Sequence, residues 1–136
     1  MTISEKQDLF VKNILAITSW EEKFEFIMDK ADSVTDCPDD YRSAEYLVKE
    51  CQSKLWMASV WKDHKLQLHF HSATLIVRGL LGVFYEIYNN HTATEIINTD
   101  FQFIEQSELS RLFSNRSIGI SAVLNRIYIE AKKEQH

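Results

Sequence analysis

The strongest constraint on the fold is a change of hydrophobic period between neighbouring segments. Residues 65–71, KLQLHFH, alternate polar and apolar side chains, which is typical of a strand with one face in the core. The run 55–61 is rich in large side chains, and the short segment 62–64 after it predicts a hairpin turn. Residues 75–88 are apolar around most of a helical circumference and predict a buried helix. The pattern therefore favours a hairpin beside a central helix.

Helix signals flank this centre on both sides. Capping patterns that begin at Ser4 and Ser19 precede apolar residues at helical spacing, so each predicts a helix start. Gly79 and Gly82 lie inside the central helix despite their cost there, which predicts close packing against a neighbour. The expected fold is α+β, a small antiparallel sheet of about three strands with helices packed against it. The other expected segments are helices over 4–16, 19–31, 94–98 and 115–133, an exposed connection over 33–43, in which one helical turn is an open alternative, and an extended piece over 46–48.

Length, charge and composition narrow the class of protein. The 136 residues, 45% of them hydrophobic, suit one domain that spans residues 1–136. The net charge is −5 and the Lys and Arg residues are scattered, which disfavours nucleic-acid binding. The first residues, MTISEKQ, are polar and predict no secretory signal, and the apolar run 75–88 is too short to span a bilayer. We expect a soluble, cytoplasmic protein whose two cysteines are free thiols.

Cys51 is the leading chemical candidate. It lies in the stretch VKECQSKLW, just before a predicted strand, where a thiol on a loop has access to a partner. The backbone N–H groups of Gln52 and Ser53 are candidate donors to its thiolate. The Glu50 carboxylate acts in the other direction, because a like charge raises the pKa of a thiol. The alternative reading is a small buried residue at the start of a strand.

The other candidate residues carry weaker signals. Cys37 lies in an acidic segment, DCPDD, which disfavours a thiolate and indicates an incidental surface thiol. His69 and His71 share a strand face without a third ligand nearby in sequence, so a solvated face is favoured over a metal site. Arg116, near the start of the last helix, is a candidate buried anchor or anion partner. The tryptophans at positions 20, 56 and 61 are expected in the core.

Residues 51–56, CQSKLW, form the most specific motif of the chain. They resemble the active-site segment C-Q-S-x-V-W of the SufE family, sulfur-acceptor proteins that work with a cysteine desulfurase in iron–sulfur cluster assembly. Glu50 stands where that family usually has Gly, which permits positive φ and close backbone approach. In order and spacing the resemblance covers most of the chain, from about residue 8 to residue 132. The supporting motifs are WEEKF at 20–24, IVRGL at 76–80 and RSIG at 116–119.

The resemblance implies a fold and a chemistry. The fold would be SufE/IscU-like, similar to the U-type iron–sulfur scaffold, with the cysteine on a loop and its sulfur in an apolar pocket at rest. Cys51 would take persulfide sulfur from a SufS-like cysteine desulfurase, stimulate that enzyme and pass the sulfur to a SufBCD-like cluster scaffold. The pyridoxal phosphate belongs to the desulfurase, and neither a cofactor nor a metal is implied for this chain. The chain would be a sulfur carrier and activator rather than a stand-alone enzyme, as a monomer or weak homodimer.

Other functions stay open on the residues alone. A metal or cluster scaffold of U-type fold needs three cysteines, or cysteines with His and Asp, at one end of the fold, and the chain has two cysteines. A thiol-redox enzyme needs a C-x-x-C pair or a resolving cysteine near a basic group, and neither is visible. An inactive desulfurase-binding module would bind the partner without sulfur transfer, with Glu50 marking the loss.

Overall fold

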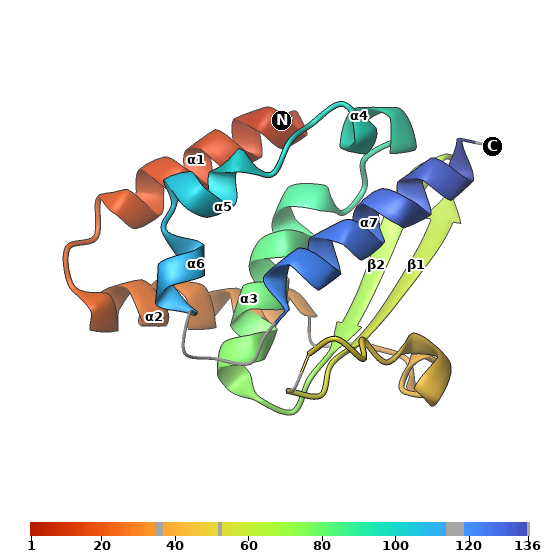
Figure 1. The fold of residues 1–136 in the computed structure, drawn as a ribbon, viewed down its shortest axis with the longest axis horizontal. Helices are drawn as coiled ribbons and strands as arrows, with labels where there is room; N and C mark the ends of the chain where they lie inside the picture. The colour runs from red at the N-terminus through yellow and green to blue at the C-terminus, as the bar shows by residue number, and fades with distance from the viewer. Residues whose placement is uncertain (35–36, 52, 114–118, 136) are drawn as a thin grey trace.

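The computed structural model describes residues 1–34, 37–51, 53–113 and 119–135 and has a mostly helical α+β fold (Figure 1). The expected fold class is therefore confirmed. The elements are the helices α1 (Ile3–Leu15) and α2 (Trp20–Met28), the 3-10 helices η1 (Asp29–Val34), η2 (Asp39–Tyr41) and η3 (Ala44–Tyr46), the strands β1 (Trp56–Lys62) and β2 (Lys65–His71), and the helices α3 (Leu75–Tyr88), α4 (Ala93–Ile97), α5 (Gln102–Gln106), α6 (Leu109–Leu112) and α7 (Ile120–Glu134).

The hairpin forms where the alternating pattern predicts it. β1 and β2 pair antiparallel from Trp56↔His71 to Lys62↔Lys65, and the register runs without a bulge along both strands. Asp63 and His64, with φ of 53° and 66°, form the two-residue turn whose twist suits a hairpin. The apolar side chains of β2 are buried in the core, as their spacing predicts; they are Leu66, Leu68 and Phe70.

The opposite face of β2 is less open to water than expected. Gln67, His69 and His71 are half-buried. The Tyr41 ring, from η2, lies 5.0 Å from the His69 ring, and the Trp56 ring lies 5.5 Å from the His71 ring. The 3-10 segment that sequence analysis reads as an exposed connection therefore covers part of this face.

The described sheet has two strands rather than about three. The expected extended piece over 46–48 shrinks to a single antiparallel bridge between Leu47 and Trp56. Its neighbours explain this, because η3 ends at Tyr46 and a turn begins at Lys49. Too few residues remain between them for a ladder of hydrogen bonds.

Helix α3 is the centre of the fold, with the hairpin on one side and α1 and α2 on the other (Figure 1). A Cβ atom at Gly79 would lie 2.5 Å from the Ile27 carbonyl oxygen, and one at Gly82 would overlap the Lys30 carbonyl oxygen. The predicted close packing at both glycines is confirmed. The partners are the backbones of α2 and η1, so α3 lies closer to them than a side chain would allow.

The helix ends depend on capping residues. Thr2, rather than Ser4, caps α1, because its hydroxyl accepts from the Glu5 N–H at 3.0 Å while the Glu5 carboxylate accepts from the Thr2 N–H at 2.9 Å. Ser19 caps α2 as predicted. In the described part of the last helix, α7 begins at Ile120 after Gly119, and the predicted start over 115–118 lies outside the described residues.

Other expectations need correction. Trp20 is 45% exposed rather than buried, because it is the first residue of α2 and lies beside the Arg111 guanidinium, 5.7 Å from its ring. Trp56 and Trp61 are half-buried. The short helices α5 and α6 are absent from the sequence prediction, since four or five residues give too little periodicity to detect. In the described ranges, no helix combines the length and apolarity needed to cross a membrane.

Gly82→Ala tests the close approach of α3. Alanine is normally about 1 kcal/mol better than glycine inside a helix. Here the added Cβ overlaps the Lys30 carbonyl oxygen, so we expect the free energy of unfolding to fall by about 1–3 kcal/mol, as in overpacked cores. Urea unfolding measures it, with the exposed Ser121→Ala on α7 as a control. Stabilisation by Gly82→Ala would contradict this packing.

Candidate functional site

Cys51 lies at the end of a tight turn in a loop between the β-bridge residue Leu47 and strand β1. Its own N–H donates to the Val48 carbonyl oxygen at 3.3 Å. The Val48 N–H in turn donates to the Leu55 carbonyl oxygen at 3.0 Å, beside the bridge between Leu47 and Trp56. The base of this loop, called here the Cys51 loop (residues 48–55), is therefore closed by backbone hydrogen bonds.

A buried serine fixes the C-terminal end of the loop, at Lys54. Ser72, which is 1% exposed, donates from Oγ to the Lys54 carbonyl oxygen at 2.9 Å. The same hydroxyl accepts from the Thr74 N–H at 3.3 Å, just before α3 begins. Because Ser72 lies in the short connection between β2 and α3, it attaches the loop to the residues that lead into the central helix.

Helix α7 holds the N-terminal end of the loop, at Leu47. Arg126 donates from Nη1 to the Leu47 carbonyl oxygen at 3.3 Å. Its side chain also lines a shallow cavity of about 350 Å³ between α7, η3 and β1. Arg126 thus fixes the residue from which the loop departs and brings a positive charge near its base.

The sulfur of Cys51 points inward and is held by a glycine from a distant part of the chain. Cys51 is 9% exposed and belongs to the apolar core cluster, whereas the neighbouring Lys49 and Glu50 are exposed. The Gly119 N–H, at the N-cap of α7, donates to Cys51 Sγ at 3.1 Å. The loop therefore shelters the thiol, while the adjacent side chains of Lys49 and Glu50 face solvent.

The Gly119 N–H is a donor to the sulfur that the sequence does not predict. Gln52 lies outside the described residues, and Arg116 does too. Within the described part of the loop, the Ser53 N–H makes no hydrogen bond to Sγ. Gly119 was visible in the sequence only as the last residue of the RSIG motif, and nothing local to Cys51 points to it.

The surroundings of Cys51 disfavour the thiolate at rest. Burial is the largest effect and raises the pKa of the Cys51 thiol. The Gly119 N–H opposes burial and lowers that pKa, because it stabilises the anion. The Glu50 carboxylate raises the pKa further and the Arg126 guanidinium lowers it. The net direction is upward, so the sheltered thiol is mostly protonated at neutral pH.

Glu50 occupies the position before the cysteine without backbone strain. The described non-glycine residues with positive φ are Asp63, His64, Asn90 and Glu108. Glu50 is not among them, so its place in the turn needs no glycine. The effect of this residue on the site is therefore one of charge.

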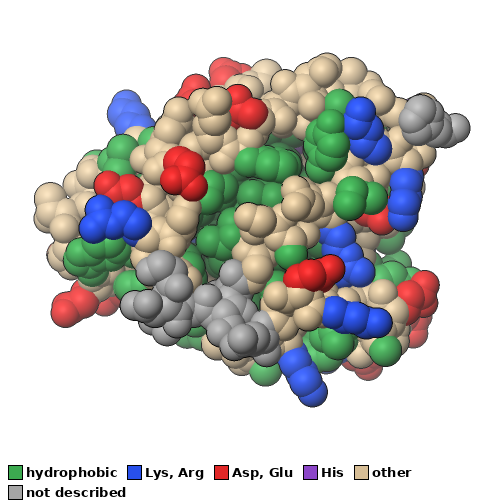
Figure 2. All heavy atoms as spheres, viewed as in Figure 1, with side chains coloured by type: hydrophobic (Ala, Val, Ile, Leu, Met, Phe, Trp, Pro, Cys, Tyr) green, Lys and Arg blue, Asp and Glu red, His purple; other side chains and the backbone are tan. Residues whose placement is uncertain are grey.

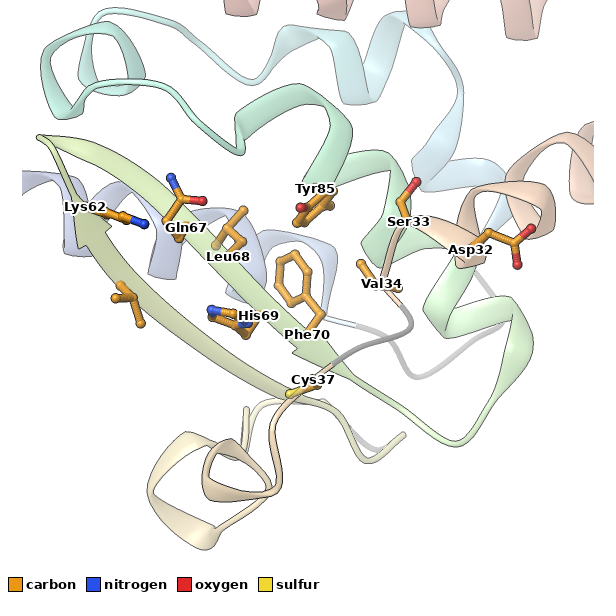
Figure 3. A pocket seen from close by; sticks show the side chains of 11 residues that line it. Asp32, Ser33, Val34, Cys37, Lys62, Gln67, Leu68, His69, Phe70 and Tyr85 are labelled. Carbon is orange, nitrogen blue, oxygen red and sulfur yellow. The ribbon is translucent and has the colours of Figure 1, made fainter.

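Cys37 is buried rather than a surface thiol as expected. It is 7% exposed, and burial raises the pKa of its thiol. Arg42 donates from Nη2 to the Cys37 carbonyl oxygen at 3.1 Å, which links the two ends of the segment 37–42. The Cys37 side chain lines one end of a groove of about 450 Å³, together with Val34 of η1 and Phe70 of β2 (Figure 3). Cys51 is not part of this groove, so the two thiols have different surroundings.

The described residues do not form a cluster of metal ligands. No group of three His, Cys, Asp or Glu side chains in these ranges is placed to hold a metal ion. Both cysteines are free thiols. The surface face seen in Figure 2 carries Lys and Arg as well as Asp and Glu side chains.

Comparison with known proteins gives the family. Residues 8–131 match the family model described as "SufE: Fe-S metabolism associated domain". The chain belongs to the SufE family. Membership implies a role in the sulfur-transfer steps of iron–sulfur cluster assembly, with a cysteine desulfurase as the partner.

A solved structure has the same fold. The chain is similar to the solution structure of a hypothetical protein from Thermus thermophilus, with a TM-score of 0.79 and 19% sequence identity. The match covers 96% of this chain and 96% of that one. At this identity the similarity shows the fold, and the SufE-like arrangement expected from the sequence is confirmed.

Glu50→Gln tests the charge beside the thiol. Removing the carboxylate removes a cause that raises the Cys51 pKa, so this pKa should fall. The pH dependence of Cys51 alkylation by iodoacetamide, followed by peptide mass spectrometry, measures it. Glu134→Gln at the far end of α7 is the matched control and should leave the profile unchanged. An unshifted midpoint in Glu50→Gln would show that this charge does not reach the sulfur.

Arg126→Gln should shift the Cys51 pKa in the opposite direction, upward. Loss of the guanidinium removes a cause that lowers the Cys51 pKa, so the alkylation midpoint should move to higher pH. Arg126→Lys keeps the charge and should keep the midpoint near that of the unchanged protein, although it weakens the bond to Leu47. A downward shift in Arg126→Gln would contradict the assignment.

Proposed function

We propose that this protein accepts sulfur from a SufS-like cysteine desulfurase on Cys51 and passes it to a SufBCD-like iron–sulfur cluster scaffold. The observation that carries the proposal is the placement of Cys51, a sheltered thiol at the tip of a loop whose base is fixed to Ser72, just ahead of α3, and to Arg126 of α7. Such a loop presents one nucleophile without disturbing the fold. The free state of both cysteines also fits a reducing compartment such as the cytoplasm.

The transfer step is a thiol–persulfide exchange. The Cys51 thiolate attacks the terminal sulfur of the persulfide on the desulfurase. A sulfur–sulfur bond forms at Cys51 as the one on the desulfurase breaks, and the desulfurase cysteine leaves as a thiolate that takes up a proton. One sulfur–sulfur bond replaces another, so the step needs no oxidant or reductant.

The shelter around Cys51 has a chemical use at rest. A protonated, buried thiol reacts slowly with oxidants, since the thiolate is the reactive form. For transfer the sulfur has to leave the core cluster and reach the partner. Outside it, the largest cause of the raised pKa is relieved, so the thiol becomes more acidic where the thiolate is needed.

Acceptance of sulfur also explains stimulation of the partner. A desulfurase that holds a persulfide on its own cysteine cannot take the next sulfur there. Removal of that sulfur by Cys51 frees the desulfurase cysteine for another turnover. The cofactor chemistry stays with the desulfurase, and this chain contributes the thiol and the surface that presents it.

Cys51→Ser should abolish sulfur transfer. Incubation with a cysteine desulfurase and free cysteine should add about one sulfur mass, about 32 Da, to the Cys51 peptide of the unchanged protein. Cys37→Ser is the matched control and should keep this mass at Cys51, since Cys37 lines a different groove. Mass spectrometry of alkylated peptides measures both.

Two outcomes would contradict the proposal. An added mass that maps only to Cys37 would show that Cys37, and not Cys51, is the sulfur acceptor. Binding to the desulfurase with no added mass on either cysteine would show a module that binds the partner without accepting sulfur.

A further inference from the structure

The base and the tip of the Cys51 loop are held very differently. The base is tied to other elements through Ser72 to the Lys54 carbonyl oxygen and through Arg126 to the Leu47 carbonyl oxygen. The described part of the tip has one hydrogen bond to another element, from the Gly119 N–H to Cys51 Sγ. The Cys51 N–H also donates to the carbonyl oxygen of Val48 at the base of the loop, and rotation of the Cys51 side chain leaves this backbone bond in place. Among the hydrogen bonds of the described residues, movement of the sulfur out of its shelter breaks the one from Gly119 and leaves those at the base in place.

Gly119 leaves the space that the sulfur occupies. A Cβ atom at this position would lie 3.1 Å from Cys51 Sγ and 3.1 Å from the Ala122 Cβ, closer than ordinary contact. It would also lie 3.6 Å from the Glu50 carbonyl oxygen, against the turn itself. Any side chain here would compete with the sheltered position of the thiol.

The Gly119 N–H is also suited to an anion. Gly119 is the N-cap of α7, a 15-residue helix whose N-terminal end carries partial positive charge. The donor therefore lowers the pKa of the thiol that burial raises. The same N–H group both holds the sulfur in place and reduces the rise in its pKa that burial causes.

We infer that Gly119 is the positioning residue that sets the balance between sheltered and presented Cys51. This inference rests on the proposed role of Cys51 as the sulfur acceptor. The hydrogen bond from Gly119 to Sγ has to break whenever the thiol is presented. A partner contact that displaces the first turn of α7 away from the loop would shift the population toward the presented state, since it binds that state better.

Gly119→Ala tests the inference without a desulfurase. The backbone at Gly119, with φ −80° and ψ 76°, is close to the inverse γ-turn conformation, which alanine also adopts, so the backbone need not change. The added Cβ should displace Sγ and weaken its hydrogen bond. We expect Cys51 alkylation to become about 2- to 10-fold faster at neutral pH, the factor that loss of one hydrogen bond covers. Burial has a larger effect on the Cys51 pKa than the Gly119 hydrogen bond, so its relief should outweigh the weakened bond and move the alkylation midpoint to lower pH.

Cys37 and Ala122 supply the controls. Cys37 lies in a separate groove, so its alkylation rate in the same sample should not change. Gly119→Ala with Ala122→Gly removes the second crowded contact and leaves the one to the sulfur, so the faster Cys51 reaction should persist. Ala122→Gly alone should react like the unchanged protein.

Each other outcome would overturn the inference. An unchanged or slower Cys51 rate in folded Gly119→Ala would show that Gly119 does not position the sulfur. Equal acceleration at Cys37 would show general loosening, which thermal unfolding would also reveal. Loss of the effect in the double variant would assign it to Ala122. Failure of sulfur acceptance itself is seen separately, in the unchanged protein with a desulfurase.

Discussion

The approach of α3 to the backbones of α2 and η1 is the constraint on which the site depends. Gly79 and Gly82 allow this contact, because a Cβ at either position would meet a carbonyl oxygen. The position of α3 in turn fixes Ser72, three residues before its first residue, and the Ser72 hydroxyl donates to the Lys54 carbonyl oxygen. The chain of contacts thus runs from a glycine face in the core to one end of the Cys51 loop.

Groups around Cys51 shift the pKa of its thiol in opposite directions. Burial and the Glu50 carboxylate favour the protonated thiol, whereas Gly119 and Arg126 favour the anion. A thiol that is protonated and unreactive when sheltered is protected from oxidants. The same thiol becomes more acidic when presented, which suits a carrier that reacts with a specific partner. The two groups that favour the anion both belong to or cap α7, so this helix contributes both the hold on the loop and the electrostatic support.

Local patterns in the sequence predict the local parts of this structure. The alternation over 65–71 predicts the hairpin, and the glycines of 75–88 predict a close helix contact, because both follow from neighbouring residues. Gly119 lies 68 positions from Cys51, and Arg126 lies 79 positions from Leu47, so no spacing rule connects them. The burial of Cys37 and the exposure of Trp20 likewise depend on elements that pack from elsewhere in the chain.

The central claim is that Cys51 removes sulfur from a desulfurase, and the stoichiometry of one turnover tests it most directly. Without reductant, a desulfurase releases alanine only until its own cysteine carries a persulfide. Addition of this protein should raise the alanine released by about one equivalent per chain, one sulfur for each attacking thiol, and Cys51→Ser should add none. The same excess of alanine with Cys51→Ser as with the unchanged protein would contradict the account.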